Sequence, residues 1–274
     1  MYIGIDIGGT NIRVAGFTKR TKPEVPEIVR FPVRNNYQID LQRLIEAIRE
    51  VSKDQKIQGI GIGIAGVLDK NKSSLRVSPN LSNWITKPLK KDLEGEFSVP
   101  VFIENDALVS AIGEANFGLG KGKDFLFMVW GTGVGGAVVK QIDGKVYAFP
   151  SEPGHQIIMY KGELCLCGQR GCVEAYCGGG NLKRKYGDGL DAIPDKEWDI
   201  IFRNFARGVS NYVAANFSEL VVLTGTVSQK QKKRVARLPA LVSETLKIYP
   251  SPKVVVSELG DLGALYGALS LIVQ

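Results

Sequence analysis

The chain has 274 residues, of which 44% are hydrophobic, and a formal net charge of +7, so it can bury one substantial core or two smaller ones. No run of about 18 apolar residues and no basic and then apolar leader occurs, which excludes an ordinary membrane-spanning helix and favours a cytoplasmic protein. The positive charge alone does not indicate nucleic-acid binding, and we expect its one cluster, Lys230, Lys232, Lys233 and Arg234, to be a solvated helix face.

The first part of the chain predicts a mixed α/β unit. Tyr2 to Asp6 and Ile12 to Phe17 are short apolar runs on either side of a Gly8-Gly9-Thr10 turn, which is typical of a hairpin. Apolar residues at helical spacing follow between Leu41 and Val51. From Ile57 to Ile64 glycine alternates with isoleucine. This pattern predicts a strand whose bare glycine face lets another element or a ligand approach closely.

A glycine-rich stretch then separates two lobes. Val101 to Glu104 predicts a strand and Ala107 to Asn116 a helix, after which glycines at positions 118, 120 and 122 interrupt the pattern. We therefore expect an N-terminal lobe of residues 1–117 and a C-terminal lobe of residues 118–259. A helix within about 260–274 is expected to pack back on the first lobe.

The second part of the chain begins like the first. Phe125 to Trp130 predicts a strand, Gly131 to Gly136 a turn, and Ala137 to Lys140 a returning strand, so that strand, glycine and threonine turn, and strand occur twice. This repetition indicates an internal duplication. The later predicted elements are a helix at Ile200 to Phe217, strands at Leu220 to Thr224 and Val254 to Ser257, and a helix at Leu262 to Leu271.

The glycine turns match no generic nucleotide motif well. No Walker sequence occurs, and Gly-x-Gly-x-x-Gly matches at Gly61 to Gly66 and at Gly131 to Gly136. The dinucleotide fingerprint requires a helix directly after the loop, whereas Ala137-Val138-Val139 continues as a strand, so we reject an NAD site. Each turn alone could be a plain tight hairpin. Two such turns, each with a threonine, favour phosphate binding, and Asp6 beside the first turn could support a magnesium ion.

Cys165, Cys167 and Cys172 lie too close in sequence for an ordinary disulfide scaffold, and the single histidine, His155, precedes them. Three thiolates and one imidazole suit tetrahedral zinc, and with four protein ligands the ion would be structural. The alternative is three unligated buried thiols. Cys177 is left over, and we expect it to be buried and inert.

These motifs resemble a known family. Asp6-Ile7-Gly8-Gly9-Thr10, together with Gly131 to Gly136, resembles the two phosphate loops of the actin and hexokinase superfamily. This likeness implies an α/β fold of two ribonuclease-H-like lobes, the actin-like ATPase or hexokinase fold, with an interlobe active-site cleft that closes on ATP. Glu152-Pro153-Gly154-His155 and the cysteine run resemble the signature of the ROK family (repressors, open reading frames and sugar kinases), and the likeness extends along nearly the whole chain.

The ROK resemblance implies an ATP-dependent sugar kinase that uses Mg²⁺ and carries a structural Zn²⁺. In its Glu-Asn-Asp-Ala motif Asp106 would be the catalytic base, although Asp106 taken alone could be a helix cap. Pro79-Asn80-Leu81 resembles the family's sugar loop, and Asn83 stands where family glucokinases often carry glycine. The substrate-binding residues implied are Gly66, Asn80, Asn105, Asp106, Glu152, His155 and Glu174. Those implied for ATP are Asp6, Gly8, Gly9, Thr10, Asn11, Thr132, Gly133, Gly225 and Thr226.

The resemblance leaves the substrate open. Glucose, phosphorylated at carbon six, is the first expectation, and fructose, mannose or an N-acetylated hexosamine are alternatives. A sugar-sensing repressor of the same family is a further alternative, but it would need an N-terminal DNA-binding segment, and Asp6 lies close to the start of the sequence. We expect a homodimer that binds sugar and ATP and that binds neither nucleic acid nor membrane.

Overall fold

The computed structural model describes residues 1–19, 21, 24, 26–53, 55–187, 189–260 and 262–272. The chain divides into two units. Unit 1 consists of Met1–Gly118 and the C-terminal helix, and unit 2 consists of Leu119–Gly260. Of the expected C-terminal segment, residues 261, 273 and 274 lie outside the described part of the chain.

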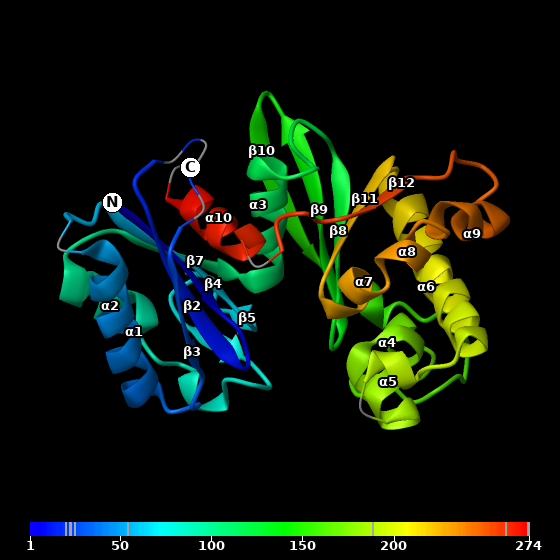
Figure 1. Ribbon diagram of the computed structural model, residues 1–274, viewed down its shortest axis with the longest axis horizontal. Helices are drawn as coiled ribbons and strands as arrows, with labels where there is room; N and C mark the ends of the chain where they lie inside the picture. The colour runs from blue at the N-terminus through cyan, green and yellow to red at the C-terminus, as the bar shows by residue number, and fades with distance from the viewer. Residues whose placement is uncertain are drawn as a thin grey trace. The chain divides into compact units, whose positions relative to one another are not determined.

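Unit 1 is built on a five-stranded mixed sheet in the order β3-β2-β1-β4-β7 (Figure 1). The strands are β1 (Tyr2–Ile7), β2 (Asn11–Phe17), β3 (Ile28–Pro32), β4 (Gly59–Ile64) and β7 (Val101–Asn105). The first three are antiparallel neighbours, whereas β4 is parallel to β1 and β7 is parallel to β4. Their alternate isoleucines and valines are fully buried and form the core of this unit.

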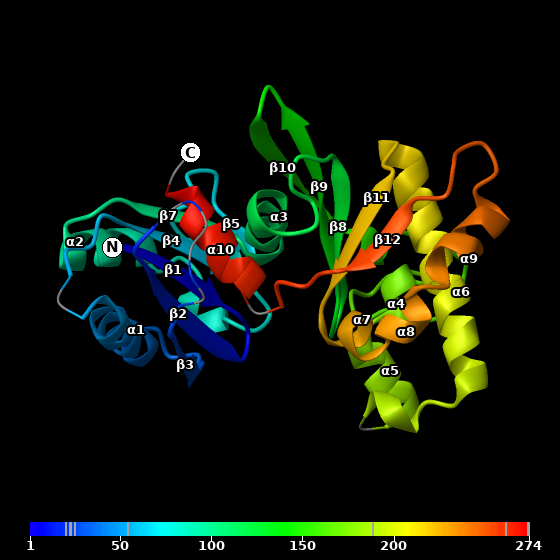
Figure 2. The same cartoon turned by 45° about the horizontal axis from the view of Figure 1, so that its top comes forward.

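The helices of unit 1 are α1 (Tyr37–Ser52), α2 (Leu89–Phe97), α3 (Asp106–Phe117) and α10 (Leu262–Leu271). A short hairpin of β5 (Val67–Leu68) and β6 (Leu75–Val77) and a 3-10 turn, η1 (Ser82–Trp84), connect β4 to α2. The C-terminal helix α10 packs on α3, β1 and β4 (Figures 1 and 2).

The glycine face of β4 receives α10 and α3 at very short range. An added Cβ at Gly61 would lie 1.8 Å from the carbonyl oxygen of Ala268 in α10, and one at Gly63 would lie 3.2 Å from Val109 in α3. Glycine is therefore required where the helix backbone touches the strand. The prediction that this strand admits another element closely is confirmed.

Replacing Gly61 with alanine is expected to lower the free energy of unfolding by about 3 kcal/mol, because the backbone of α10 must move away from the sheet. Gly95→Ala is the matched control. Gly95 lies on the exposed side of α2 with no atom within 4 Å of an added Cβ, and alanine favours a helix there by about 0.5 kcal/mol. Urea unfolding of both variants measures the difference, and equal stabilities would contradict the packing described.

Unit 2 repeats the sheet of unit 1, with the order β10-β9-β8-β11-β12. Its strands are β8 (Phe125–Trp130), β9 (Val134–Ile142), β10 (Lys145–Ser151), β11 (Leu220–Thr224) and β12 (Lys253–Val256). Again the first three are antiparallel neighbours, and the last two continue parallel to β8. The shared order confirms the predicted duplication. Strand β9 follows the glycine turn directly, whereas a dinucleotide site would need a helix there.

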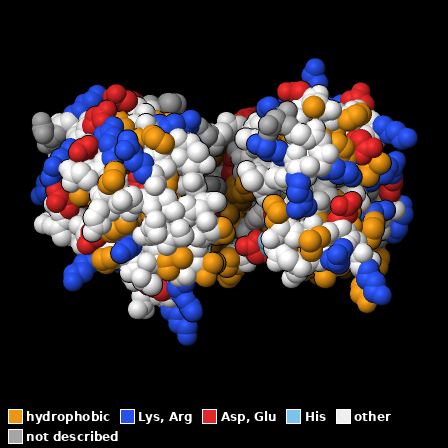
Figure 3. Space-filling view, turned by 90° about the horizontal axis from the view of Figure 1, so that it is seen from below, with side chains coloured by type: hydrophobic (Ala, Val, Ile, Leu, Met, Phe, Trp, Pro, Cys, Tyr) orange, Lys and Arg blue, Asp and Glu red, His pale blue; other side chains and the backbone are white. Residues whose placement is uncertain are grey.

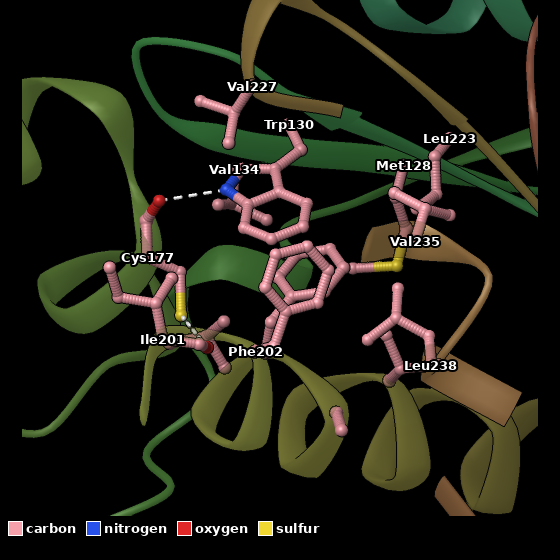
Figure 4. Close-up of a cluster of buried hydrophobic side chains, with 14 of the residues drawn as sticks. Met128, Trp130, Val134, Cys177, Ile201, Phe202, Leu223, Val227, Val235 and Leu238 are labelled. Carbon is pink, nitrogen blue, oxygen red and sulfur yellow. Dashed lines mark hydrogen bonds between the residues drawn. The ribbon is translucent and has the colours of Figure 1, made fainter. Parts of the chain in front are cut away.

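The helices of unit 2 are α4 (Val173–Cys177), α5 (Gly179–Tyr186), α6 (Asp195–Asn216), α7 (Thr226–Lys230), α8 (Lys232–Val235) and α9 (Leu238–Thr245), with 3-10 turns η2 (Pro153–His155) and η3 (Leu190–Ala192). In the core Trp130 stacks on Phe205 with ring centroids 3.8 Å apart. The Trp130 indole also donates to the carbonyl of Cys177 at 2.8 Å (Figure 4). Cys177 is fully buried, as predicted, and burial raises the pKa of its thiol.

The predicted basic cluster lies on α7 and α8. Lys230, Lys232 and Lys233 are exposed, and Arg234 is paired with Asp195, which confirms a solvated helix face. Basic and acidic side chains are interspersed over the face of each unit seen in Figure 3. In the described part of the chain, no helix combines the length and the apolar composition that a membrane crossing requires.

Candidate functional site

The first glycine turn joins β1 to β2 in unit 1. The Gly8 amide donates across the turn to the Asn11 carbonyl at 3.0 Å, and the Val33 amide donates to the Thr10 carbonyl at 2.8 Å. Among the hydrogen bonds of the described residues, none has the amide of Gly9 or Thr10 as its donor. Two adjacent amides and an exposed threonine, the groups from which an anion site can be built, thus lie in this turn.

Asp6, at the end of β1, is nearly buried and pairs with Arg13. The two residues are cross-strand partners in the hairpin, and the Arg13 Nε atom donates to the Oδ2 atom of Asp6 at 2.8 Å, with a second bond from Nη2. The guanidinium therefore fixes the carboxylate of Asp6 beside the turn. Arg13 was not among the residues predicted from the sequence, although the hairpin register around Gly8 and Thr10 could have placed it opposite Asp6.

The loop that carries Asn80 touches the first turn. An added Cβ at Gly9 would lie 2.6 Å from the Cβ atom of Asn80, so the asparagine lies directly against this glycine. The same loop is held from its other end, because the Asn83 side chain donates to the Asn35 carbonyl at 2.8 Å and the Asn83 amide donates to the Asn35 side chain at 3.2 Å. A glycine at position 83 could make only the second of these bonds, so the Asn83 side chain adds one hydrogen bond to the loop.

Asp106 is the first residue of α3, and the cap of that helix is its neighbour. The side-chain oxygen of Asn105 accepts from the amides of Ala107 and Leu108. The Asn105 amide group donates to the Gly66 carbonyl and to the Oδ1 atom of Asp106, each at 3.1 Å. The capping function thus belongs to Asn105, and Asn105 also orients the carboxylate of Asp106.

The second glycine turn joins β8 to β9 in unit 2 and repeats the first. The Gly131 amide donates to the Gly133 carbonyl at 3.0 Å, and the Thr132 side chain is exposed. In the described residues no hydrogen bond has the amide of Thr132 or Gly133 as its donor. The predicted equivalence of the two turns therefore extends to the pair of adjacent amides that each leaves available.

The residues that follow the cysteine run hold the second turn. The Gly179 amide donates to the Gly131 carbonyl at 2.8 Å, and the Gly180 amide donates to the Thr132 carbonyl at 2.7 Å. The Oε2 atom of Glu174 accepts from the Val134 amide at 2.8 Å. These contacts could not be predicted from the sequence, because nothing in the local pattern indicates which distant segment contacts a turn.

Gly225 and Thr226, the predicted adenosine loop, lie beside the same turn. Gly225 has a φ of 96°, and an added Cβ there would lie 2.6 Å from the Trp130 carbonyl oxygen. An added Cβ at Gly131 would lie 3.9 Å from the Thr226 hydroxyl. Unit 2 thus brings together two of the segments predicted to bind the nucleotide.

The four predicted zinc ligands converge in unit 2. One donor atom from each of His155, Cys165, Cys167 and Cys172 lies within 4.8 Å of the others. The Nδ1 atom of His155 is buried and accepts or donates no hydrogen bond among the described residues. One imidazole nitrogen and three thiols form a donor set that tetrahedral zinc prefers, so these four residues fit that ion.

The thiols of this cluster differ in environment. Burial raises the pKa of Cys165, and burial raises that of Cys172 to about 12. A hydrogen bond from the Gln169 backbone lowers the pKa of the exposed Cys167. Burial thus disfavours the thiolate forms of Cys165 and Cys172, and a bound cation would favour them.

Glu152 precedes the η2 turn that carries His155. Burial raises the pKa of the Glu152 carboxyl group, an effect that His155 opposes and that the nearby Glu174 carboxylate increases. Two carboxylates and an imidazole are therefore neighbours beside the cysteine cluster. Such a group offers several hydrogen-bond acceptors to a polyhydroxylated ligand.

The sequence-predicted residues thus form two sets. Unit 1 carries the first turn, Asp6, Asn80 and the group of Gly66, Asn105 and Asp106. Unit 2 carries the second turn, the predicted adenosine loop, the two acidic residues and the predicted metal ligands. The structure brings these residues together within each unit, and their assigned roles stay predictions.

Comparison with known proteins identifies the family. A profile of the ROK family matches residues 2–274. The chain belongs to the ROK family. This ROK protein is 29% identical to a glucokinase of Thermotoga maritima over 306 aligned positions, which cover 96% of this chain and 95% of the relative.

Solved ROK structures share the fold. A ROK family glucokinase from Streptomyces griseus, in complex with glucose and AMPPNP, superposes with a TM-score of 0.77 at 25% identity and 98% coverage of both chains. A ROK hexokinase from Thermus thermophilus superposes with a TM-score of 0.81 at 26% identity, covering 98% of this chain and 97% of the other. The expected actin-like ATPase and hexokinase fold is confirmed.

Other relatives have different names. An N-acetyl-D-glucosamine kinase of Photobacterium profundum is 28% identical with both chains fully covered. A xylose repressor of Caldicellulosiruptor bescii is 30% identical over 64% of this chain and 45% of the repressor. Family membership therefore establishes the fold and leaves the substrate to be argued from the residues.

Proposed function

We propose that this ROK protein is an ATP-dependent sugar kinase whose first substrate is glucose, phosphorylated at its primary hydroxyl. The observation that carries the proposal is the pair of equivalent glycine turns, each with two adjacent amides available to an anion. Two such turns suit the phosphate chain of ATP. The nucleotide bound by the similar Streptomyces griseus glucokinase supports this assignment.

Asp106 is proposed as the base. The hydroxyl oxygen of the sugar attacks the γ-phosphorus of ATP, the bond from that phosphorus to the bridging oxygen breaks to leave ADP, and the hydroxyl proton passes to the Asp106 carboxylate. The bond from Asn105 orients the carboxylate before the sugar arrives. Alignment of the reactants contributes most of the acceleration, since phosphoryl transfer needs little covalent assistance.

The phosphate grip is assigned to backbone atoms. Gly8, Gly9, Thr10 and Asn11 would bind phosphate from unit 1, Thr132 and Gly133 from unit 2, and Gly225 with Thr226 would contact the adenosine. Asp6 would support a magnesium ion, directly or through water, and the ion supplies neutralisation of phosphate charge. Arg13 keeps the carboxylate of Asp6 in place for this purpose.

The sugar contacts proposed are Gly66, Asn80 and Asn105 from unit 1 and Glu152, His155 and Glu174 from unit 2. The cysteine cluster with His155 would hold a structural zinc ion, which fixes the loop that carries this histidine. A homodimeric assembly and a cytoplasmic location stay predictions, as does the absence of nucleic-acid and membrane partners.

ADP release over a panel of sugars tests the proposal. Glucose is expected to give the highest kcat/KM, with mannose, fructose, N-acetylglucosamine and N-acetylmannosamine lower by about 10-fold or more, because polar groups left unpaired in a hydroxyl-reading site are costly. A reaction without sugar gives the background hydrolysis of ATP. Highest activity with an N-acetylated hexosamine would overturn the choice of glucose, and background rates with every sugar would overturn the kinase assignment.

A further inference from the structure

The carboxylate of Glu174 lies against the second phosphate turn. Its Oε2 atom accepts from the Val134 amide at 2.8 Å, and an added Cβ at Gly133 would lie 2.5 Å from that same oxygen. Its Oε1 atom lies 3.8 Å from the Sγ atom of Cys165. One carboxylate thus touches both the turn and the cysteine cluster.

The helix that carries Glu174 is itself fastened to the turn. The carbonyl of Cys177, the last residue of α4, accepts from the Trp130 indole (Figure 4). The next residues, Gly178 to Gly180, pack so closely that an added Cβ at Gly179 would lie 2.7 Å from the Gly131 carbonyl oxygen. These contacts fix the carbonyls of the turn from one side.

The carbonyls and the flanking amides of the turn are engaged, whereas no hydrogen bond among the described residues has the Thr132 or Gly133 amide as its donor. A negatively charged acceptor on the Val134 amide makes a charge-assisted bond, which is stronger than a neutral one. The charge itself does not favour a nearby phosphate, so Glu174 acts through the backbone that it holds.

We propose that Glu174, in addition to the sugar contact assigned to it, is a positioning residue for the nucleotide. It positions the nucleotide by fixing the Val134 amide and the second phosphate turn. This inference rests on the proposed function. One carboxylate would then serve both substrates, and loss of its hydrogen-bond acceptor would weaken nucleotide binding even when no sugar is present.

Titration calorimetry with ADP on the metal-loaded protein, without sugar, tests the inference. Glu174→Ala is expected to raise the Kd for ADP by about 10-fold or more, because it removes a charge-assisted acceptor from the turn. Glu174→Gln keeps a carbonyl acceptor for the Val134 amide and is expected to stay within about 3-fold of the parent protein. Both variants are expected to weaken glucose binding, which separates the two functions of the residue.

Glu152→Ala is the matched control for Glu174→Ala. Glu152 is the neighbouring carboxylate proposed for the sugar, and no hydrogen bond among the described residues joins its side chain to the turn. Its replacement is expected to weaken glucose binding and to leave the Kd for ADP within about 3-fold of the parent value. The reason is that removing a carboxylate with no bond to the turn does not move the turn. An equal loss of ADP affinity in both variants would contradict a specific contribution of Glu174.

Gly133→Ala gives an independent measurement that does not truncate Glu174. The added methyl group displaces the carboxylate from the Val134 amide and is expected to weaken ADP binding, whereas in the Glu174→Ala background it should have little further effect. Because Gly133 is itself assigned to the phosphate grip, the test is the difference between the two backgrounds, and equal effects of Gly133→Ala in both would overturn the inference. If the parent protein bound no nucleotide, the proposed function would fail as well; if it bound ADP and Glu174→Ala bound it equally, only the inference would fail.

Discussion

Replacing Asp106 with asparagine is expected to lower kcat for sugar phosphorylation by about 1,000-fold, because the side chain can no longer accept the hydroxyl proton. The KM for ATP should change little, since the phosphate grip is assigned to the glycine turns. The fold should be retained, because Asn105 caps α3 and an asparagine oxygen can still accept from the Ala107 amide. Steady-state ADP release with saturating glucose and ATP measures kcat directly.

Asp143→Asn provides the control for Asp106→Asn. Asp143 is an exposed aspartate in the turn between β9 and β10, with a φ of 50° that asparagine also adopts readily. It has no assigned part in binding or catalysis, so kcat should not change. A kcat for Asp106→Asn within about 3-fold of the parent value would exclude Asp106 as the base.

The parts of the site that depend on local sequence could be predicted. The two glycine turns were recognisable because a hairpin turn is determined by a few consecutive residues. The same holds for the cysteine run with His155. The alternation of glycine in β4 correctly predicted close packing, although the pattern could not name α10 as the partner. In each case the signal and the residues that create it lie within one short segment.

Contacts between distant segments could not be predicted in the same way. The bond from Val134 to Glu174 joins residues 40 positions apart, and the bonds between Asn35 and Asn83 join loops 48 positions apart. Burial and tertiary packing decide such contacts, and residue type alone does not. The edge strands β3 and β10 were also missed, because each contains a proline and neither has the continuous buried run of a central strand.

The interpretation of Asp106 changed with the structure. From its position before a helix it could have been a cap, and capping is now assigned to Asn105, which accepts from the amides of Ala107 and Leu108. The same asparagine donates to Gly66 and to Asp106. A residue that caps the helix therefore also orients the proposed base, so that the start of α3 and the acceptor loop are fixed together.

Loss of the proposed zinc ion is expected to destabilise unit 2 strongly. Cys172→Ser should remove the metal and lower the free energy of unfolding by about 3 kcal/mol or more, which corresponds to a fall in Tm of about 8 °C. The reason is that a metal ion held by four residues of one unit adds its binding free energy to folding, and Cys172 is a fully buried member of this set. Metal analysis of the purified protein should give about one zinc per chain.

Cys177→Ala separates metal binding from ordinary packing of a buried cysteine. Cys177 lies outside the predicted four-ligand cluster, and its thiol donates to the Ile201 carbonyl at 3.4 Å. This variant should therefore keep its zinc and lose only the stability of a small core truncation, about 1 kcal/mol. Cys172→Ser should instead lose both the zinc and the affinity for glucose, because His155 is held by the metal on one side and is proposed to face the sugar on the other. The four residues would be an unligated cluster if the purified parent protein contained no zinc and if Cys172→Ser had the same Tm and the same glucose affinity as the parent protein.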